Sequence, residues 1–144
     1  MPVVKAVCVS EKTGQTKVPV ASIELKVDYG IAGDAHAGSS RQVSLLDFAS
    51  MERMKEKLAT IGPGSFAENI AVEGLNALKL AVGDSIRVGE NVVLQITQIG
   101  KTCHHGCEIR QIVGDCIMPK EGLFAKVQNG GTVRPGDTLA RVAG

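Results

Sequence analysis

Aromatic side chains are scarce in this chain of 144 residues: they make up 3% of it, with no Trp and one Tyr. Proteins that bind single-stranded nucleic acid often stack its bases on aromatic rings, and such a platform is hard to build from so few. A basic surface is lacking as well, since 16 Lys and Arg are balanced by 15 Asp and Glu, for a net charge of +1. That balance gives no broad positive field to attract phosphates. We therefore expect no nucleic-acid partner.

Long apolar runs are also missing. No stretch approaches the ~20 consecutive apolar residues that a membrane helix needs. The chain reaches polar residues by Ser10, too early for the charged start and hydrophobic stretch of a signal peptide. We expect no membrane partner and a cytoplasmic location. There the four Cys would be free, metal-bound or catalytic rather than joined in disulfides.

What the chain does have is a set of short β-branched or alternating segments between turn residues, a pattern typical of strands. Its 17 glycines also suit a tightly turned β fold. Two similar turns place Gly-Asp directly before an apolar segment, at Gly83-Asp84 and Gly136-Asp137, and we interpret both as structural corners. The segments expected to be strands are 3–10, 22–27, 41–46, 69–72, 85–88 and 92–99.

One main helix is predicted near residues 47–58. Asp47 suits the N-cap position, and four apolar residues follow at helical spacing, namely Phe48, Met51, Met54 and Leu58. The Gly62-Pro63-Gly64 stretch would end the helix. No linker or low-complexity segment divides the chain, so we predict a single domain over residues 1–144 with a mainly β (α+β) fold.

Thiols and imidazoles are concentrated in one short segment. Two of the four Cys and two of the three His lie within five consecutive positions, from Cys103 to Cys107. A thiolate is a strong nucleophile, and a neighbouring imidazole such as His104 can lower the pKa of its thiol. The segment follows the predicted strand 92–99 and opens a Gly-containing loop, where rigid strands usually hold catalytic groups. Cys103, Cys107 and His104 are therefore candidate catalytic residues.

Two other interpretations of this segment stay open. Cys103 and Cys107, four residues apart, could ligate zinc together with Cys116 or His36. Alternatively, one cysteine is a small core residue and the histidines lie at the surface. For Cys8, which stands between two Val, and for Cys116, among apolar neighbours, a place in the core is the preferred interpretation.

A glycine-rich stretch covers residues 30–38. It lacks the Gly-Lys-Ser/Thr of a Walker A motif and the βαβ setting of a dinucleotide site, although its backbone N–H groups could still hold an anion. Asp34 and His36, two apart, could act as an acid–base pair or could bond the backbone to hold a turn. Arg41 could bind a phosphate or be an ordinary surface residue. The remaining polar candidates for bonds to a loop or a ligand are Glu68 and Asn69.

In combination these stretches resemble the MOSC domain, the C-terminal module of molybdenum-cofactor sulfurases, in its short stand-alone bacterial form. The resemblance covers roughly residues 3 to 142 and rests on several stretches taken together rather than on any one of them. Those stretches are 30–38, 41–46, 64–70, 83–84, 94–101, 103–104, 107, 114–119 and 121–125.

The resemblance implies a MOSC-like β-barrel and a link to the molybdenum cofactor (molybdopterin), a pterin dithiolene that carries a phosphate. Family members are thought to carry sulfur as a persulfide on a cysteine, or to bind the cofactor with a cysteine as metal ligand. Cys103 and Cys107 match that cysteine region, and Asn69 matches a polar residue that helps to hold the cofactor. The family's desulfurase activity belongs to a fused pyridoxal-phosphate domain for which this chain has no room. The resemblance therefore implies sulfur transfer without an intrinsic desulfurase.

Two functions follow from the residues and the resemblance together. In the first, Cys103 accepts sulfane sulfur from a cysteine desulfurase or another donor and passes it to a molybdenum-cofactor enzyme or biosynthesis protein. In the second, the chain binds the cofactor, and Cys103 or Cys107 ligates molybdenum. A structural zinc domain is the remaining alternative. The candidate cofactor-binding residues are Gly33, Asp34, His36, Arg41, Glu68 and Asn69.

Overall fold

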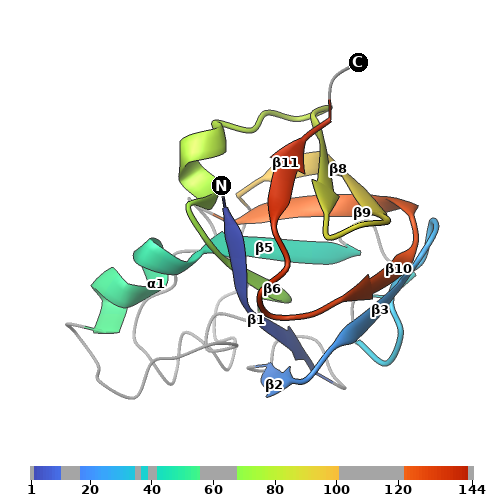
Figure 1. Ribbon diagram of the computed structural model, residues 1–144, viewed down its shortest axis with the longest axis horizontal. Coiled ribbons are helices and arrows are strands. Elements are labelled where there is room, and N and C mark those ends of the chain that lie inside the picture. Colours follow the sequence, from blue (N-terminus) through green and yellow to red (C-terminus); the bar gives the residue numbers. More distant parts are fainter. Residues whose placement is uncertain are drawn as a thin grey trace.

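A computed structural model of the chain describes residues 2–10, 17–34, 37–38, 42–55, 68–100 and 122–142. Most of the regular structure is strand, which confirms the mainly β prediction (Figure 1). The helices are α1 (Phe48–Lys55) and a short 3₁₀ helix (Leu75–Leu78). The strands are β1 (Val3–Val9), β2 (Val18–Val20), β3 (Ile23–Lys26), β4 (Gly30–Ile31), β5 (Val43–Asp47), β6 (Ile70–Glu73), β7 (Ser85–Val88), β8 (Val92–Ile99), β9 (Leu123–Asn129), β10 (Gly131–Val133) and β11 (Leu139–Arg141).

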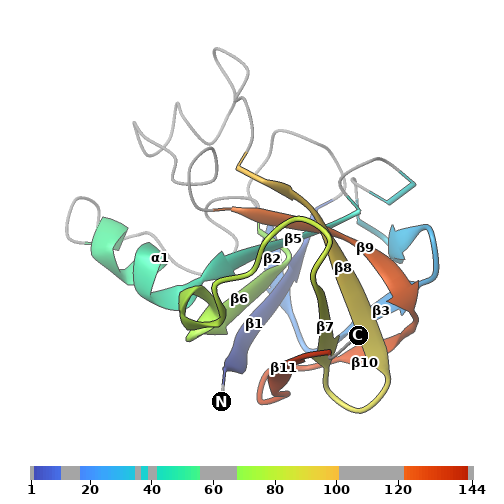
Figure 2. The same cartoon turned by 90° about the horizontal axis from the view of Figure 1, so that it is seen from above.

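Eight strands form the large sheet, in the order β11-β7-β8-β9-β5-β6-β1-β2. Strands β5 and β6 are parallel, whereas the other paired neighbours are antiparallel. All five residues of β5 are buried, as expected for a strand near the middle of a sheet with both faces covered. Helix α1 follows β5 directly and lies at the outside of the molecule (Figures 1 and 2).

A second sheet has three short strands in the order β10-β3-β4. Its buried apolar residues, among them Ile23, Leu25 and Ile31, share one hydrophobic core with the large sheet. Strand β4 lies close to the residue that precedes β5, because a Cβ on Gly30 would stand 2.9 Å from the Gln42 carbonyl oxygen. Only glycine fits that position, where the backbone φ is also +122°.

Strand β11, at one end of the large sheet, approaches β1, the last strand but one at the other end, through backbone hydrogen bonds. Val4 N–H donates to the Asp137 carbonyl at 2.8 Å, and Leu139 N–H donates to the Pro2 carbonyl at 2.9 Å. A single bridge pairs Val3 with Thr138, and Figure 1 shows β1 beside β11. The strand order itself is open rather than a continuous closed barrel.

The helix prediction is confirmed at its start. The Asp47 carboxylate accepts the Ala49 N–H at 2.8 Å, which is the N-cap bond expected of this residue. Its second oxygen accepts the Asn76 N–H at 2.7 Å, so the same side chain also fixes the 3₁₀ helix. Residues 56–67, with the predicted helix end, lie outside the described part.

Replacing Asp47 with Ala removes both bonds. We expect the free energy of unfolding to fall by about 2 kcal/mol, from one lost cap and one lost backbone partner. Asp47→Asn keeps a side-chain oxygen for the Ala49 N–H but presents an NH₂ to the Asn76 N–H, so it should lose only the second bond and about half of that free energy. Urea denaturation of the two variants measures the difference, and equal losses would contradict the capping role.

The two Gly-Asp corners have the same geometry. Asp84 accepts the N–H of Ala81 at 2.8 Å, and Asp137 accepts the N–H of Arg134 at 2.9 Å, each three residues back. The preceding glycines have φ values of +97° and +99°, which favour glycine. Both turns are therefore structural, as predicted, and each leads into its strand after a short gap or none.

The strand predictions differ from the structure mainly by omission. Segments 85–88 and 92–99 match β7 and β8. Segment 3–10 is one residue too long at its end, and 22–27 and 69–72 each differ from β3 and β6 by one residue at both ends. Segment 41–46 overlaps β5, and its first position lies outside the described residues. Strands β2, β4, β9 and β10 were not expected. In β9 the first three residues are all buried, so no alternation signals a strand there. Within the described ranges, no helix is both long and apolar enough to cross a membrane.

Candidate functional site

The predicted site residues fall into two groups. Cys103, Cys107, His104, His36 and Arg41 lie outside the described residues, so their placement stays a prediction. The structure describes the other four, which are Gly33, Asp34, Glu68 and Asn69. Three of these four are buried polar residues, and together with Ser10, Lys17 and Ser44 they form what we call the buried polar cluster.

Asp34 is held in a buried ion pair. The Lys17 Nζ donates to Asp34 Oδ1 at 2.7 Å, and both side chains are 0% exposed. The backbone N–H of Ser10 donates to the same oxygen at 3.1 Å, and Lys17 Nζ also donates to the Ser10 hydroxyl at 3.2 Å. Three segments therefore meet at one carboxylate: the end of β1, the residue before β2, and the turn after β4.

Asn69 joins three strands of the large sheet. Its side-chain oxygen accepts the Ser44 N–H at 2.9 Å and the Ser44 hydroxyl at 3.1 Å. Its side-chain NH₂ donates to the Cys8 carbonyl at 3.1 Å. The backbone adds a bond from Cys8 N–H to the Asn69 carbonyl at 2.7 Å. Asn69 thus connects β1, the start of β6 and β5 from a position with 0% exposure.

Cys8 lies in the core, as predicted, and borders the buried polar cluster. Burial raises the pKa of its thiol from 9.0 to about 12; the negative charge of Glu68 also raises it, and Lys17 lowers it. Near neutral pH this thiol is therefore protonated and a poor nucleophile. Glu68 itself is fully buried. Cys8 is accordingly a structural cysteine, unlike the nucleophile predicted in segment 103–107.

Gly33 differs from the other described candidates because it is exposed. Its φ is +83°, and a Cβ added there would meet nothing within 4 Å. The space beside this backbone is open, which suits the close approach of a ligand. Gly33 directly precedes the buried Asp34. The same turn therefore has exposed backbone at Gly33 and a side chain fixed in the core at Asp34.

The Cys/His segment is joined to two neighbouring strands near the middle of the large sheet. In the sequence it follows β8 and precedes β9. Just after the end of β8 and just before the start of β9, the Gly100 N–H donates to the Gly122 carbonyl at 2.7 Å. The register of β8 against β9 shifts between Ile96 and Gln98, and such irregularities often redirect side chains next to active sites. The described residues on either side of the segment therefore lie at the ends of two hydrogen-bonded strands.

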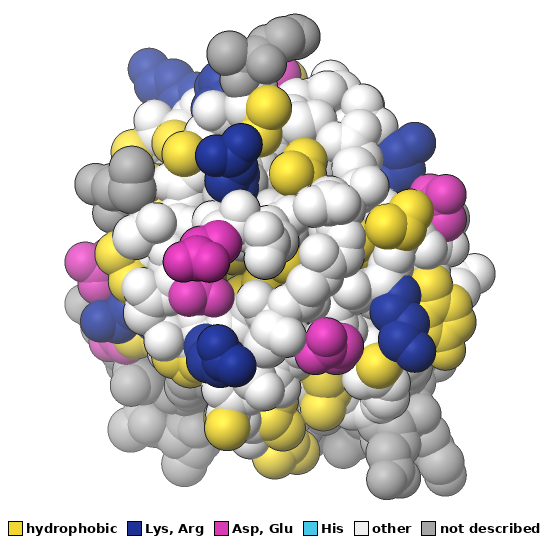
Figure 3. Space-filling model, turned by 45° about the vertical axis from the view of Figure 1, so that its right-hand side comes forward, with side chains coloured by type: hydrophobic (Ala, Val, Ile, Leu, Met, Phe, Trp, Pro, Cys, Tyr) yellow, Lys and Arg dark blue, Asp and Glu magenta, His cyan; other side chains and the backbone are white. Residues whose placement is uncertain are grey.

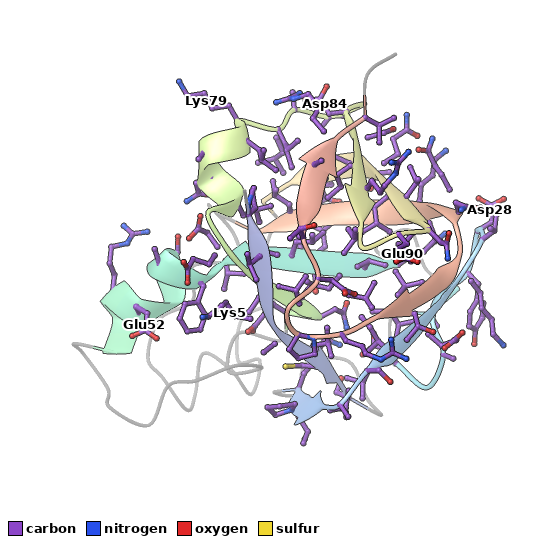
Figure 4. All side chains as sticks on the ribbon, viewed as in Figure 1. Lys5, Asp28, Glu52, Lys79, Asp84 and Glu90 are labelled. Carbon is purple, nitrogen blue, oxygen red and sulfur yellow. The ribbon has the colours of Figure 1, made fainter. Side chains whose placement is uncertain are left out.

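Charged side chains elsewhere in the described part lie mostly at the periphery. Figure 4 labels Lys5, Asp28, Glu52, Lys79, Asp84 and Glu90, all of which are partly or fully exposed. On the face drawn in Figure 3, basic and acidic groups alternate and no broad patch of one sign forms. The Lys17–Asp34 pair is thus unusual in its setting, because burying charge is costly.

Sequence reasoning missed Lys17, Ser10 and Ser44. A signal for Lys17 was available, since it stands directly before the apolar Val18-Pro19-Val20 stretch. Its partner could not be read from the sequence, because Asp34 is 17 positions away. Among the described residues, no group of three or more His, Cys, Asp or Glu could hold a metal ion.

Solved structures similar to this chain share its fold. The YuaD protein of Bacillus subtilis superposes with a TM-score of 0.76 and 19% identity, over 96% of this chain and 94% of that one. YiiM of Geobacillus stearothermophilus has a TM-score of 0.75 and 17% identity, over 99% of this chain and 76% of its own. YiiM of Escherichia coli has a TM-score of 0.72 and 19% identity, over 100% and 71%.

No curated protein matches the chain. At these identities the structural likeness shows the fold alone, and the family follows from the sequence itself. The family model described as MOSC domain matches residues 32–140, well over half of the chain. That range takes in the exposed turn at Gly33, the buried residues Asp34 and Asn69, and the Cys/His segment. The chain therefore belongs to the MOSC domain family.

Proposed function

We propose that this chain is a sulfur carrier for molybdenum-cofactor chemistry. A cysteine of the 103–107 segment receives sulfane sulfur from a cysteine desulfurase or another donor and delivers it to a metal–sulfur or molybdenum-cofactor centre. The observation that carries the proposal is the gathering of two thiols and two imidazoles in five residues, between the ends of β8 and β9. The MOSC domain family is associated with molybdenum-cofactor sulfurase-like proteins.

The first step is thiolate attack on a persulfide. The sulfur of Cys103 attacks the outer sulfur of the donor persulfide, a new S–S bond forms, and the donor's S–S bond breaks. The donor leaves as a thiolate, so no net oxidation occurs. An imidazole such as that of His104 favours the reactive thiolate form of Cys103. In this proposal the donor generates the persulfide.

Delivery as sulfide needs two electrons, because sulfane sulfur must be reduced. Cys107 is a suitable source within this chain. Its thiolate attacks the inner sulfur of the Cys103 persulfide, a Cys103–Cys107 disulfide forms, and hydrosulfide leaves for the acceptor. The disulfide then needs a dithiol reductant to return to the starting state. This order gives the two cysteines different roles, one as acceptor and one as resolving thiol.

The donor groups fit the molybdenum cofactor in their chemistry. Thiolates such as Cys103 and Cys107 suit a soft metal, and Arg41 with the exposed backbone at Gly33 suits a pterin phosphate. When bound, the cofactor would supply the metal that accepts sulfur. Asp34 and Asn69 are buried and bond to Lys17, Ser10, Ser44 and Cys8, so in such a site they would support the floor from within the core.

Mass spectrometry tests the acceptor. Incubation with a cysteine desulfurase and cysteine should add about 32 Da, one sulfur, to the wild-type chain by thiol–persulfide exchange. Cys103→Ser should abolish the gain. Cys107→Ser should accumulate the Cys103 persulfide, since the resolving thiol is absent. Cys8 serves as an internal control, because its thiol is fully buried and its pKa is raised.

Other outcomes separate the alternatives. A sulfur gain that survives in Cys103→Ser and disappears in Cys107→Ser would reverse the two roles. Absence of any gain, with molybdenum and a pterin co-purifying, would replace the carrier by a cofactor-binding module. One equivalent of zinc, with loss of the fold on chelation, would support a structural zinc domain.

A further inference from the structure

One ion pair in the described part of the chain differs from the others in its burial. The side chains of Lys5–Glu73 are 42% and 64% exposed, and those of Arg141–Asp84 are 43% and 31% exposed. Lys17 and Asp34 are both 0% exposed. An exposed pair costs little to form, whereas a buried pair must first lose the hydration of both charges.

Stability alone does not explain such a pair. Replacing a buried ion pair with apolar side chains of similar volume is often neutral or stabilising, because the desolvation cost disappears with the charges. The alternative is that the pair holds a particular segment of the backbone in position. This requires a segment that the regular strand pairing does not already hold.

The turn after β4 meets that requirement. Strand β4 pairs with β3 through two residue pairs, Leu25–Ile31 and Lys26–Gly30. One further backbone bond, from the Ala32 N–H to the Glu24 carbonyl at 2.9 Å, continues this contact into the turn. Beyond it the described chain continues through exposed Ala32 and Gly33 to the buried Asp34. There the carboxylate accepts bonds from the Lys17 ammonium and from the Ser10 N–H. These bonds tie the turn to both the end of β1 and the residue before β2.

We propose that Lys17 and Asp34 are positioning residues, whose buried ion pair holds the exposed turn at Gly33 in place rather than stabilising the fold. In the sequence the turn precedes His36 and Arg41, two of the predicted site residues. The ion pair therefore fixes the position of the backbone from which that part of the chain continues. The expected effect of the ion pair on sulfur transfer rests on the proposed function. Its expected effect on the position of the turn is independent of that function.

The test compares the double variant Lys17→Met/Asp34→Leu with the wild-type chain and with Lys5→Met/Glu73→Leu, which removes an exposed pair on β1 and β6. Melting temperature reports stability. Hydrogen exchange read by mass spectrometry, with intrinsic rates corrected for sequence, reports the turn in peptides covering residues 29–34 and the core in peptides covering β8. The rate of sulfur gain at Cys103 reports function.

The expected result is a melting temperature close to wild type, unchanged exchange in β8, and exchange in residues 29–34 at least about tenfold faster. Sulfur gain should slow by a similar factor of about ten, since displacement of a site segment weakens orientation. The exposed-pair control should match wild type in every measurement. Asp34→Asn leaves the Lys17 ammonium buried without a counter-charge, so it should speed exchange in the same peptides and also lower the melting temperature.

Wild-type exchange in residues 29–34 of a folded double variant would overturn the proposal, whatever happens to sulfur gain. A double variant that melts far below wild type or fails to fold would also overturn it, because the pair would then be a stability element. A wild-type chain that gains no sulfur would count against the proposed function only, and exchange would still decide the positioning role.

Discussion

Lys17→Met alone is expected to lower the free energy of unfolding by about 3–5 kcal/mol. The substitution leaves the Asp34 carboxylate in the core without the ammonium that stands 2.7 Å from it, and an uncompensated buried charge is strongly destabilising. A domain of this size has a total stability of about 5–15 kcal/mol. The loss is therefore large enough to show as a clear fall in the urea midpoint.

Lys5→Met is the matched control for this prediction. It removes the same side chain from an ion pair at 3.4 Å with Glu73, where both partners are substantially exposed. Exposed pairs contribute about 0–1 kcal/mol, so this variant should unfold close to wild type. Similar losses for the two substitutions would show that the Lys17–Asp34 pair is not desolvated as the structure describes.

Asn69→Ala is expected to cost about 3 kcal/mol or more of unfolding free energy, since several buried groups lose hydrogen bonds at once. Its amide oxygen accepts both the N–H and the hydroxyl of Ser44, and its NH₂ donates to the Cys8 carbonyl. The side chain is fully buried, so water does not readily replace these partners. Denaturant unfolding followed by circular dichroism measures the loss.

Asn129→Ala is a control of the same residue type. The Asn129 NH₂ donates to the Asn91 carbonyl in an exposed position, where water can take over the lost bond. A change within about 0.5 kcal/mol of wild type is expected for such a surface site. If Asn69→Ala were equally mild, the amide would not be the junction of β1, β5 and β6 that its contacts indicate.

Local sequence patterns predicted the elements whose causes are local. The segment 92–99 alternates or is β-branched, and it forms β8. Asp47 has the short acceptor side chain that a helix start prefers, and it caps α1. The Gly-Asp pairs at 83–84 and 136–137 form turns because a positive φ and an acceptor for the N–H three residues back are encoded in neighbouring positions.

The candidate site was predictable only in its residue types. The sequence identified Asp34 and Asn69 as candidate binding residues, but it did not identify their hydrogen-bond partners. The Asn69 side chain bonds to Ser44 and Cys8, which are 25 and 61 positions away in the chain. No local periodicity contains such information, because side-chain neighbours across a sheet depend on the strand order. Lys17 contacts Asp34 only because the fold brings the residue before β2 next to the turn after β4.

The amino-acid sequence by itself determined the mainly β composition, the position of α1, the corners at Gly83 and Gly136, and membership of the MOSC domain family. Each of these depends on residues that are close in the chain or on a pattern along it. Only the tertiary structure decided that Lys17 and Asp34 share a buried ion pair and that Asn69 joins three strands. Burial and pairing are properties of segments brought together in space, and the free energy of a buried charge depends on which segment supplies its partner.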